Sequence, residues 1–133
     1  ITQEQIDFML EQRYGAERLY DDIEDADKWL DQAFLDGRRV GFAFSELYEG
    51  EFKLDKLYIH PDVQRRGVGG QLIEHVAARA KKIGYPCVIL AVNKRNTKAI
   101  GSYEKYGFVV RESIVDDIGR GFVMDDFVME KKL

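Results

Sequence analysis

The chain has 133 residues and a mass of 15.4 kDa, the usual size of a single domain built around one core. Hydrophobic residues make up 45% of the sequence and charged residues 33%, and no apolar run approaches the roughly 20 residues that span a bilayer, so we expect a soluble globular protein without a membrane span or signal peptide. A net charge of −4 and a pI near 5.2 argue against a nucleic-acid-binding protein, which needs a basic surface.

Cysteine and histidine are scarce, which limits the kinds of site. Cys87 is the single cysteine and lies in an apolar run, so we expect a buried structural thiol rather than a nucleophile. A chain that cannot form an internal disulfide suits the cytoplasm. His60 and His75 are the two histidines, and with one cysteine they give poor support for a zinc cluster, so we expect no metal.

The N-terminal part is predicted to be helical. Thr2 and Gln5 form a capping-box pattern that predicts a helix over about residues 3–13. The stretch "AERLYDDIEDA", residues 16–26, places Leu19, Tyr20 and Ile23 at helical spacing, which predicts a second amphipathic helix with a solvated acidic face.

A three-stranded antiparallel meander is predicted next. "KWLDQAFL" and "RVGFAFSEL" flank Asp36 and Gly37, a pair that supplies the positive φ angles of a tight hairpin turn. A second turn near residues 48–50 leads into "FKLDKLYIH", and Pro61 ends that strand because proline cannot donate to a sheet ladder.

The order then changes to a β-α-β unit. "GGQLIEHVAARAKKIG" predicts a helix that ends at Gly84, and "CVILAV" after it is typical of a strand buried on both faces. Asn96 or Thr97 can cap a short helix that ends at Gly107, and "FVVRESIVDD" and "GFVMDDFVMEKKL" close the chain as a hairpin. We therefore predict one domain over residues 1–133 with an α/β (α+β) fold: a mixed sheet, antiparallel first, parallel in the middle and ending in a hairpin.

Three glycines lie between the third strand of the meander and the following helix, in "VQRRGVGGQLIEHVA". The unpaired N–H groups of a helix N-terminus attract anions, glycine lets a phosphate come close, and Arg65 and Arg66 add positive charge. A Walker loop is excluded because Gly70 and Gln71 follow Gly69, and a dinucleotide fingerprint because residue 72 is leucine. A plain glycine-rich turn is the alternative.

Two stretches, in the right order, resemble motifs of the GNAT superfamily of N-acetyltransferases. "LDKLYIHPDVQRRGVGGQL" resembles its strand, its pyrophosphate loop of the Gln/Arg-x-x-Gly-x-Gly/Ala type and the helix that follows. "LAVNKRNTKAIGSYEKYGF" resembles its next strand, its asparagine region and its Tyr-x-Lys-x-Gly-Phe signature. The resemblance runs from about Val40 to Leu133, and the tail "IGRGFVMDDFVMEKKL" is similar to that of bacterial polyamine acetyltransferases.

The resemblance implies an acetyl-CoA-dependent N-acetyltransferase in which Tyr103 lies near the thioester sulfur as general acid. It also implies a cofactor groove in which the main chain around the glycines holds the pyrophosphate and the preceding strand pairs with the pantetheine arm. The implied cofactor-binding residues are Leu57, Tyr58, Ile59, Gln64, Arg65, Arg66, Gly67, Val68, Gly69, Gly70, Asn93 and Asn96.

Two departures from the family pattern stand out. The family's first strand has no counterpart before Ile1, so we expect that strand to be missing from this chain and residues of the whole protein to precede Ile1. Many members carry a glutamate base on the strand before the loop, whereas this chain offers Glu51, Asp55 or His60, directly or through water, with no choice among them.

Acetyl transfer to an amine needs an oxyanion donor, which the main-chain N–H of Tyr58 or Ile59 can supply, and a proton for the leaving thiolate. Tyr103 can give that proton because a phenol with an ordinary pKa near 10 is neutral at pH 7. Simpler roles exist for several of these residues: Tyr103 as a core aromatic, Asn96 as a helix cap, His60 as a strand-end residue, His75 as a solvated side chain, and Arg65 with Arg66 as a solvated pair.

The acceptor implied by the resemblance is a primary amine of a small molecule, a polyamine or a protein. Asp116, Asp117, Asp125 and Asp126 lie at paired positions of the last two strands and could attract a cationic amine, although strand ends rich in aspartate are also common without such a role. The family's final strands often form dimer contacts, so a homodimer is a further expectation. Two alternatives to an enzyme are a sensor or subunit that binds coenzyme A without turnover and a general anion-binding scaffold.

Overall fold

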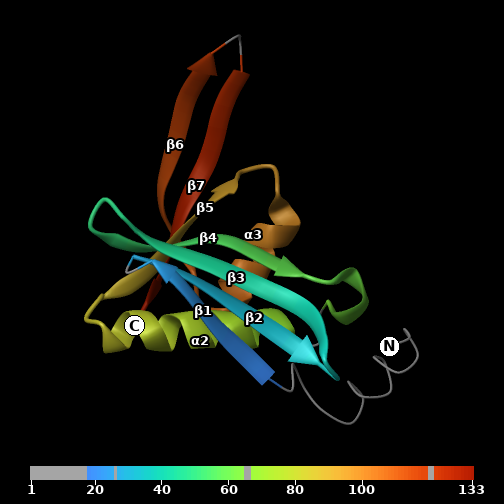
Figure 1. The fold of residues 1–133 in the computed structure, drawn as a ribbon. Coiled ribbons are helices and arrows are strands. Elements are labelled where there is room, and N and C mark those ends of the chain that lie inside the picture. Colours follow the sequence, from blue (N-terminus) through green and yellow to red (C-terminus); the bar gives the residue numbers. More distant parts are fainter. Residues whose placement is uncertain (1–17, 26, 65–66, 120–121) are drawn as a thin grey trace.

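The computed structural model of the chain describes residues 18–25, 27–64, 67–119 and 122–133 (Figure 1). Its elements, in chain order, are β1 Arg18–Asp25, β2 Lys28–Leu35, β3 Arg38–Tyr48, β4 Glu51–Ile59, a 3-10 helix Pro61–Val63, α2 Val68–Lys82, β5 Cys87–Asn93, α3 Thr97–Lys105, β6 Val109–Gly119 and β7 Phe122–Lys132. The predicted helix over residues 3–13 lies outside the described residues.

The strands form one mixed sheet in the order β1-β2-β3-β4-β5-β7-β6. Strands β1 to β4 are antiparallel, β4 and β5 are parallel, and β7 lies between β5 and β6, antiparallel to both. This is the predicted fold class: an antiparallel meander, a central parallel β-α-β unit and a C-terminal hairpin. In Figure 1 the β6–β7 hairpin extends well beyond the other strands.

The predicted turns of the meander are confirmed. Asp36 and Gly37 have φ angles of 50° and 75°, and Glu49 and Gly50 have φ angles of 49° and 79°. Two consecutive residues with positive φ match the right-handed twist of a β-hairpin, which is why each turn needs a glycine. Gly84, with φ 104°, follows the C-cap residue Ile83 of α2 as predicted.

The prediction of a helix over residues 16–26 is wrong, because the structure has strand β1 there. Arg18 lies opposite Phe34 and Asp22 opposite Leu30, so β1 pairs antiparallel with β2 and forms that edge of the sheet. The helical pattern over residues 16–26 is too short to separate a period of 3.6 from a period of 2. Pairing with the otherwise open edge of β2 satisfies the backbone of the segment, and this outweighs a weak local pattern.

Helix α2 packs on one face of the sheet, and in Figure 1 strand β1 passes in front of it. Leu72, Ile73, Val76 and Ala80 are buried in the core on this side. Among the described helices, none has the length and apolar character needed to cross a bilayer.

A buried ion pair joins β2 to α2. Asp31 is fully buried and accepts two hydrogen bonds from the Arg79 guanidinium, at 2.6 and 2.7 Å. His75, which we expected to be solvated, lies with Nε2 3.5 Å from Oδ1 of Asp31. A second charged group, Arg111, links β6 to β4 through Glu51 and to β7 through Glu130.

Strand β5 is fully buried at Val88, Ile89, Leu90 and Val92, but Ala91 is exposed. Cys87, at its start, is half-buried rather than fully buried, and its Sγ accepts a hydrogen bond from the Arg111 guanidinium at 3.1 Å. Desolvation by burial raises the pKa of this thiol, which agrees with a structural rather than a nucleophilic role.

Strands β4 and β5 run together only at their first residues. The parallel pairing consists of Phe52 with Val88 and Lys53 with Ile89. Directly after this, Asp55 forms a β-bulge, because Leu54 pairs with Ser45 and Lys56 with Phe44 while Asp55 has no partner on β3. A bulge bends its strand and increases the local twist. The second half of β4 is therefore paired with β3 and not with β5.

Candidate functional site

A pocket of about 620 Å³ lies at the second half of β4. Three segments line it: the end of β4 with the loop after it, the first turn of α2, and α3. The lining residues are Leu57, Ile59, Gln64, Gly69, Asn96, Thr97, Lys98, Ala99, Gly101, Ser102, Tyr103, Lys105 and Tyr106. Six of the predicted site residues are in this set: Leu57, Ile59, Gln64, Gly69, Asn96 and Tyr103.

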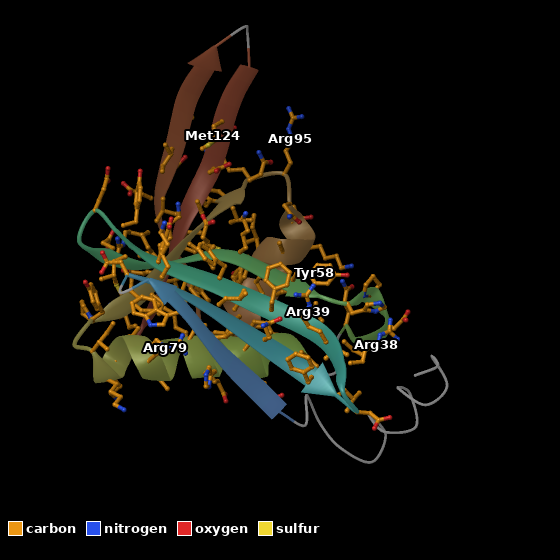
Figure 2. The ribbon with its side chains drawn as sticks, in the orientation of Figure 1. Arg38, Arg39, Tyr58, Arg79, Arg95 and Met124 are labelled. Carbon is orange, nitrogen blue, oxygen red and sulfur yellow. The ribbon has the colours of Figure 1, made fainter. Side chains whose placement is uncertain are left out.

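Strand β4 contributes an apolar wall. Leu57 and Ile59 point into the pocket because alternate residues of a strand share a face. Tyr58, between them, is 45% exposed on the opposite face and stacks on Phe42 with ring centroids 5.6 Å apart. Figure 2 labels Tyr58 and Arg39, whose guanidinium lies 5.5 Å from the centre of the Phe42 ring. The Tyr58 main chain pairs with Phe42 of β3, so the free main-chain groups at this edge of β4 are those of Leu57 and Ile59.

The glycine loop places a helix N-terminus at the pocket. Gly67 is the N-cap of α2 with φ 88°, a left-handed conformation that favours glycine, and its carbonyl accepts from Gln71 N at 3.0 Å. The N–H groups of residues 68–70, in the first turn, have no acceptor within the helix, and the N-cap has no side chain to provide one. This turn can bind an anion, with the positive end of the helix dipole adding to the attraction.

Other predicted loop residues have different positions. Gln64 donates from Nε2 to the Ile59 carbonyl at 3.3 Å, which ties the loop to the end of β4. The Val68 side chain is buried in the core, so only its main chain faces the first turn. Arg65 and Arg66 lie outside the described residues.

Gly69 and Gly70 allow a close contact between α2 and α3. A Cβ at residue 69 would stand 3.3 Å from Tyr106 Oη, and one at residue 70 would stand 2.9 Å from Tyr106 Cε1. The sequence pattern predicts that these glycines let a phosphate come close. In the structure they also make room for the Tyr106 ring, and sequence reasoning did not identify Tyr106.

Helix α3 carries Asn96 and Tyr103 into the pocket. Asn96 Oδ1 accepts from Ala99 N at 3.1 Å, so Asn96 is the N-cap of α3 and a lining residue as well. Tyr103 is half-buried and packs edge-to-face on Phe108 with ring centroids 5.7 Å apart. Burial raises the pKa of Tyr103 above its ordinary value of 10.0, so the phenol is neutral at pH 7.

Asn93 does not line the pocket. Its Oδ1 accepts from Arg95 N at 2.9 Å, which shapes the turn between β5 and α3. Asn93 thus acts on the pocket only through the position of that turn.

None of the three predicted base candidates lines the pocket. Glu51 lies at the other end of β4, where the Arg111 guanidinium holds it. Asp55 is exposed at the bulge, 3.8 Å from Lys53 Nζ. The His60 ring accepts at Nδ1 from Asp62 N at 3.1 Å, and its Nε2 lies 3.0 Å from the Arg38 guanidinium.

The two described aspartates of the predicted cluster, Asp125 and Asp126, lie on opposite faces of β7. Asp125 and Asp126 are consecutive strand residues, so their side chains point to opposite faces. Asp125 forms an ion pair with Lys94, whereas Asp126 lies opposite Asn93 on β5 and Ile114 on β6. The side chains of Asp116 and Asp117 lie outside the described residues.

Two lysines of α3, Lys98 and Lys105, also line the pocket, and neither is among the site residues predicted from the sequence. The sequence did contain a signal for them, because residues seven apart lie on the same side of a helix.

Among the described residues, no group of histidine, cysteine and acidic side chains has the geometry of a metal site.

Comparisons with known proteins agree with this geometry. The family model of the acetyltransferase (GNAT) family matches residues 2–108. The peptidyl-lysine N-acetyltransferase YjaB of Salmonella typhimurium is 42% identical over 84 residues, which are 62% of this chain and 52% of that protein. The spermidine N(1)-acetyltransferase of Thermoplasma acidophilum is 27% identical over 135 residues, 98% of this chain and 78% of that protein.

A solved structure shares the fold. The PaiA N-acetyltransferase of Thermoplasma acidophilum, solved in complex with coenzyme A, superposes with a TM-score of 0.68 at 28% identity and covers 80% of this chain and 62% of that one. The chain spans about half the length of the first curated relatives that it matches. Since the family model matches most of the sequence and the mixed sheet and glycine loop agree with it, the chain belongs to the GNAT family of acetyltransferases.

Proposed function

We propose that this chain is an N-acetyltransferase that moves an acetyl group from acetyl-CoA to a primary amine. The main support for the proposal is that three structural elements line the same pocket. The second half of β4, free of β5, the glycine-capped N-terminus of α2 and the phenol of Tyr103 all line it. The relatives named as N-acetyltransferases of peptidyl-lysine and of spermidine support the same reaction class.

The residues present fit coenzyme A. The main-chain N–H groups of residues 68–70 suit the pyrophosphate, since they have no acceptor within α2 and Gly67 brings no capping side chain. Leu57 and Ile59 offer an apolar wall to the pantetheine arm, and the main chain of β4 beyond Lys53 has donors and acceptors that β5 does not use.

Acetyl-CoA, when bound, supplies an activated acetyl thioester. Tyr103 gives its phenolic proton to the departing sulfur as the acceptor nitrogen bonds to the acetyl carbon and the carbon–sulfur bond breaks, and the phenol is then reprotonated from solvent. The main-chain N–H of Ile59, which points away from β3, donates to the carbonyl oxygen as negative charge develops there. The raised pKa of Tyr103 keeps its proton in place at neutral pH.

The acceptor must be a neutral amine when it attacks. Because Glu51, Asp55 and His60 lie outside the pocket lining, we propose that the amine loses its proton to water rather than to a carboxylate of β4. The acceptor class is a primary amine of a small molecule, a polyamine or a protein lysine, in keeping with the two relatives.

Thiol release from acetyl-CoA across a panel of amines tests the proposal, with wild type compared with Tyr103→Phe. We expect turnover by the wild type, and in the variant a loss of kcat of about a hundredfold or more with little change in KM for acetyl-CoA. Tyr48→Phe is the matched control, since Tyr48 is 48% exposed at the end of β3 and outside the pocket.

Two other results would contradict the proposal in different ways. Normal turnover of Tyr103→Phe would remove the general acid and leave the activity. A wild type that binds coenzyme A but turns over with none of the amines would point to the non-catalytic sensor or subunit.

A further inference from the structure

The charged side chains among the described residues of the pocket are all positive. Of the described residues that line it, Lys98 and Lys105 are the charged ones, and none is acidic. The whole chain, in contrast, has a net charge of −4. A cationic pocket in an acidic protein favours an anionic ligand.

The two lysines stand on one side of α3, seven residues apart, which is about 10 Å along the helix axis. Lys98 lies in the first turn, close to the N-cap Asn96, and Lys105 in the last turn. Lys105 directly precedes Tyr106, whose ring contacts the first turn of α2. The pair therefore extends from the cap of α3 toward the anion-binding turn of α2.

Neither lysine has an anionic partner among the described residues, and this separates them from two other lysines nearby. Lys94 forms an ion pair with Asp125, and Lys131 donates to the Tyr106 carbonyl at 2.6 Å. Lys98 and Lys105 are exposed at the rim of the pocket, with side chains long enough to reach a ligand there.

We infer that Lys98 and Lys105 bind the 3′-phosphate of coenzyme A and so let the pocket distinguish coenzyme A from dephospho-CoA. The inference rests on the proposed function. The α2 N-terminus supplies main-chain N–H groups and about half a positive charge, enough for the pyrophosphate. The 3′-phosphate is a separate dianion on the same ligand, and the two cations of α3 are the groups of the described pocket that match it.

Binding of coenzyme A and dephospho-CoA, measured by calorimetry, tests this inference. An exposed ion pair changes affinity by about threefold, with roughly fivefold as its upper end, so two lysines together account for about tenfold. We expect the wild type to bind coenzyme A about tenfold more tightly than dephospho-CoA. In the Lys98→Met/Lys105→Met variant the affinity for coenzyme A should fall about tenfold, while that for dephospho-CoA changes by less than about twofold.

Two control variants sharpen the comparison. Lys81→Met/Lys82→Met removes the same charge from the other end of α2, outside the pocket, and should keep the preference for coenzyme A. Lys98→Arg/Lys105→Arg keeps the positive charge and should keep the preference as well. Circular dichroism checks that each variant is folded.

Three results would overturn the inference. Equal losses for both ligands would mean that the lysines act on the pyrophosphate, and unchanged affinities would make them solvated side chains. A wild type that binds dephospho-CoA as tightly as coenzyme A would remove the selectivity and leave the proposed function standing. Failure of the wild type to bind either ligand would instead overturn the proposed function.

Discussion

The ring of Tyr106 lies against the backbone of Gly70, so that a Cβ at residue 70 would stand 2.9 Å from Tyr106 Cε1. This contact joins the first turn of α2 to the end of α3, and both segments line the pocket. Gly70 has no positive φ, so its backbone would accept another residue. What it requires is space for the Tyr106 ring.

A double-mutant cycle between residues 70 and 106 measures this contact. Gly70→Ala should destabilise the protein by about 1 kcal/mol, because crowding of the ring outweighs the better helix propensity of alanine. In a Tyr106→Ala background the same change should be neutral or stabilising by a few tenths of a kcal/mol. Urea unfolding of the four proteins gives the coupling energy, and equal effects of Gly70→Ala in both backgrounds would show that the ring does not set the requirement.

The Asp31–Arg79 pair predicts a large loss of stability when one partner is removed. Asp31 is fully buried, and the Arg79 side chain is 12% exposed. Arg79→Met leaves that carboxylate without its two charge-assisted hydrogen bonds, and we expect a loss of about 3 kcal/mol in the free energy of unfolding. Asp31→Val/Arg79→Met should recover most of it in urea unfolding. A double variant as unstable as the single one would mean that shape, not charge, explains the loss.

Glu51→Gln should leave catalysis intact. Glu51 and Ile59 are at opposite ends of β4, on the order of 25 Å apart at the usual rise of a strand, and Arg111 holds Glu51 at its end. We expect kcat and KM for the amine to stay within about twofold of wild type. A loss of kcat of about a hundredfold with a normal KM would identify Glu51 as the base and refute the role given to water.

Ionisation of the half-buried Tyr103 phenol should lower the free energy of unfolding in alkali. Burial raises its pKa above 10.0, so the native state holds the phenolic proton more tightly than the unfolded chain does. The contribution is complete below pH 10 and is lost as pH rises through the native pKa. The free energy of unfolding of the wild type, relative to Tyr103→Phe, should stay level up to about pH 9 and fall as the pH rises above about 10. A difference that stays constant over this range would mean that the phenol is not desolvated.

Predictions from the sequence are correct mainly where local chemistry decides the structure. The Asp36–Gly37 turn follows from backbone sterics, and the cap at Asn96 from hydrogen bonding within four residues. The prediction of a helix over residues 16–26 is wrong because the conformation of this segment depends on pairing with the edge of β2. A local sequence pattern does not contain that pairing. The contacts of Tyr106 and the bulge at Asp55 also depend on partners distant in the sequence.

The base candidates show that residues close in the sequence need not be close in the folded site. Glu51, Asp55 and His60 are close to the loop in sequence, but an extended strand carries Glu51 far away, and Asp55 and His60 are outside the lining. Lys98 and Lys105 were recognisable as one helical side, but their value as cations depends on the lack of acidic neighbours in the described pocket, which only the packed structure reveals.

The short pairing of β4 with β5 gives the sheet a strand edge in its interior. An edge at the margin of a sheet invites other proteins to add a strand, which is a route to aggregation. Here α2 and α3 line the pocket beside the free edge of β4, so a ligand that enters this pocket with an amide-bearing chain can pair with that edge. A ligand that completes this edge would slow hydrogen exchange at the amides of Leu57 and Ile59, which point away from β3, and these two amides would report binding whether or not turnover follows.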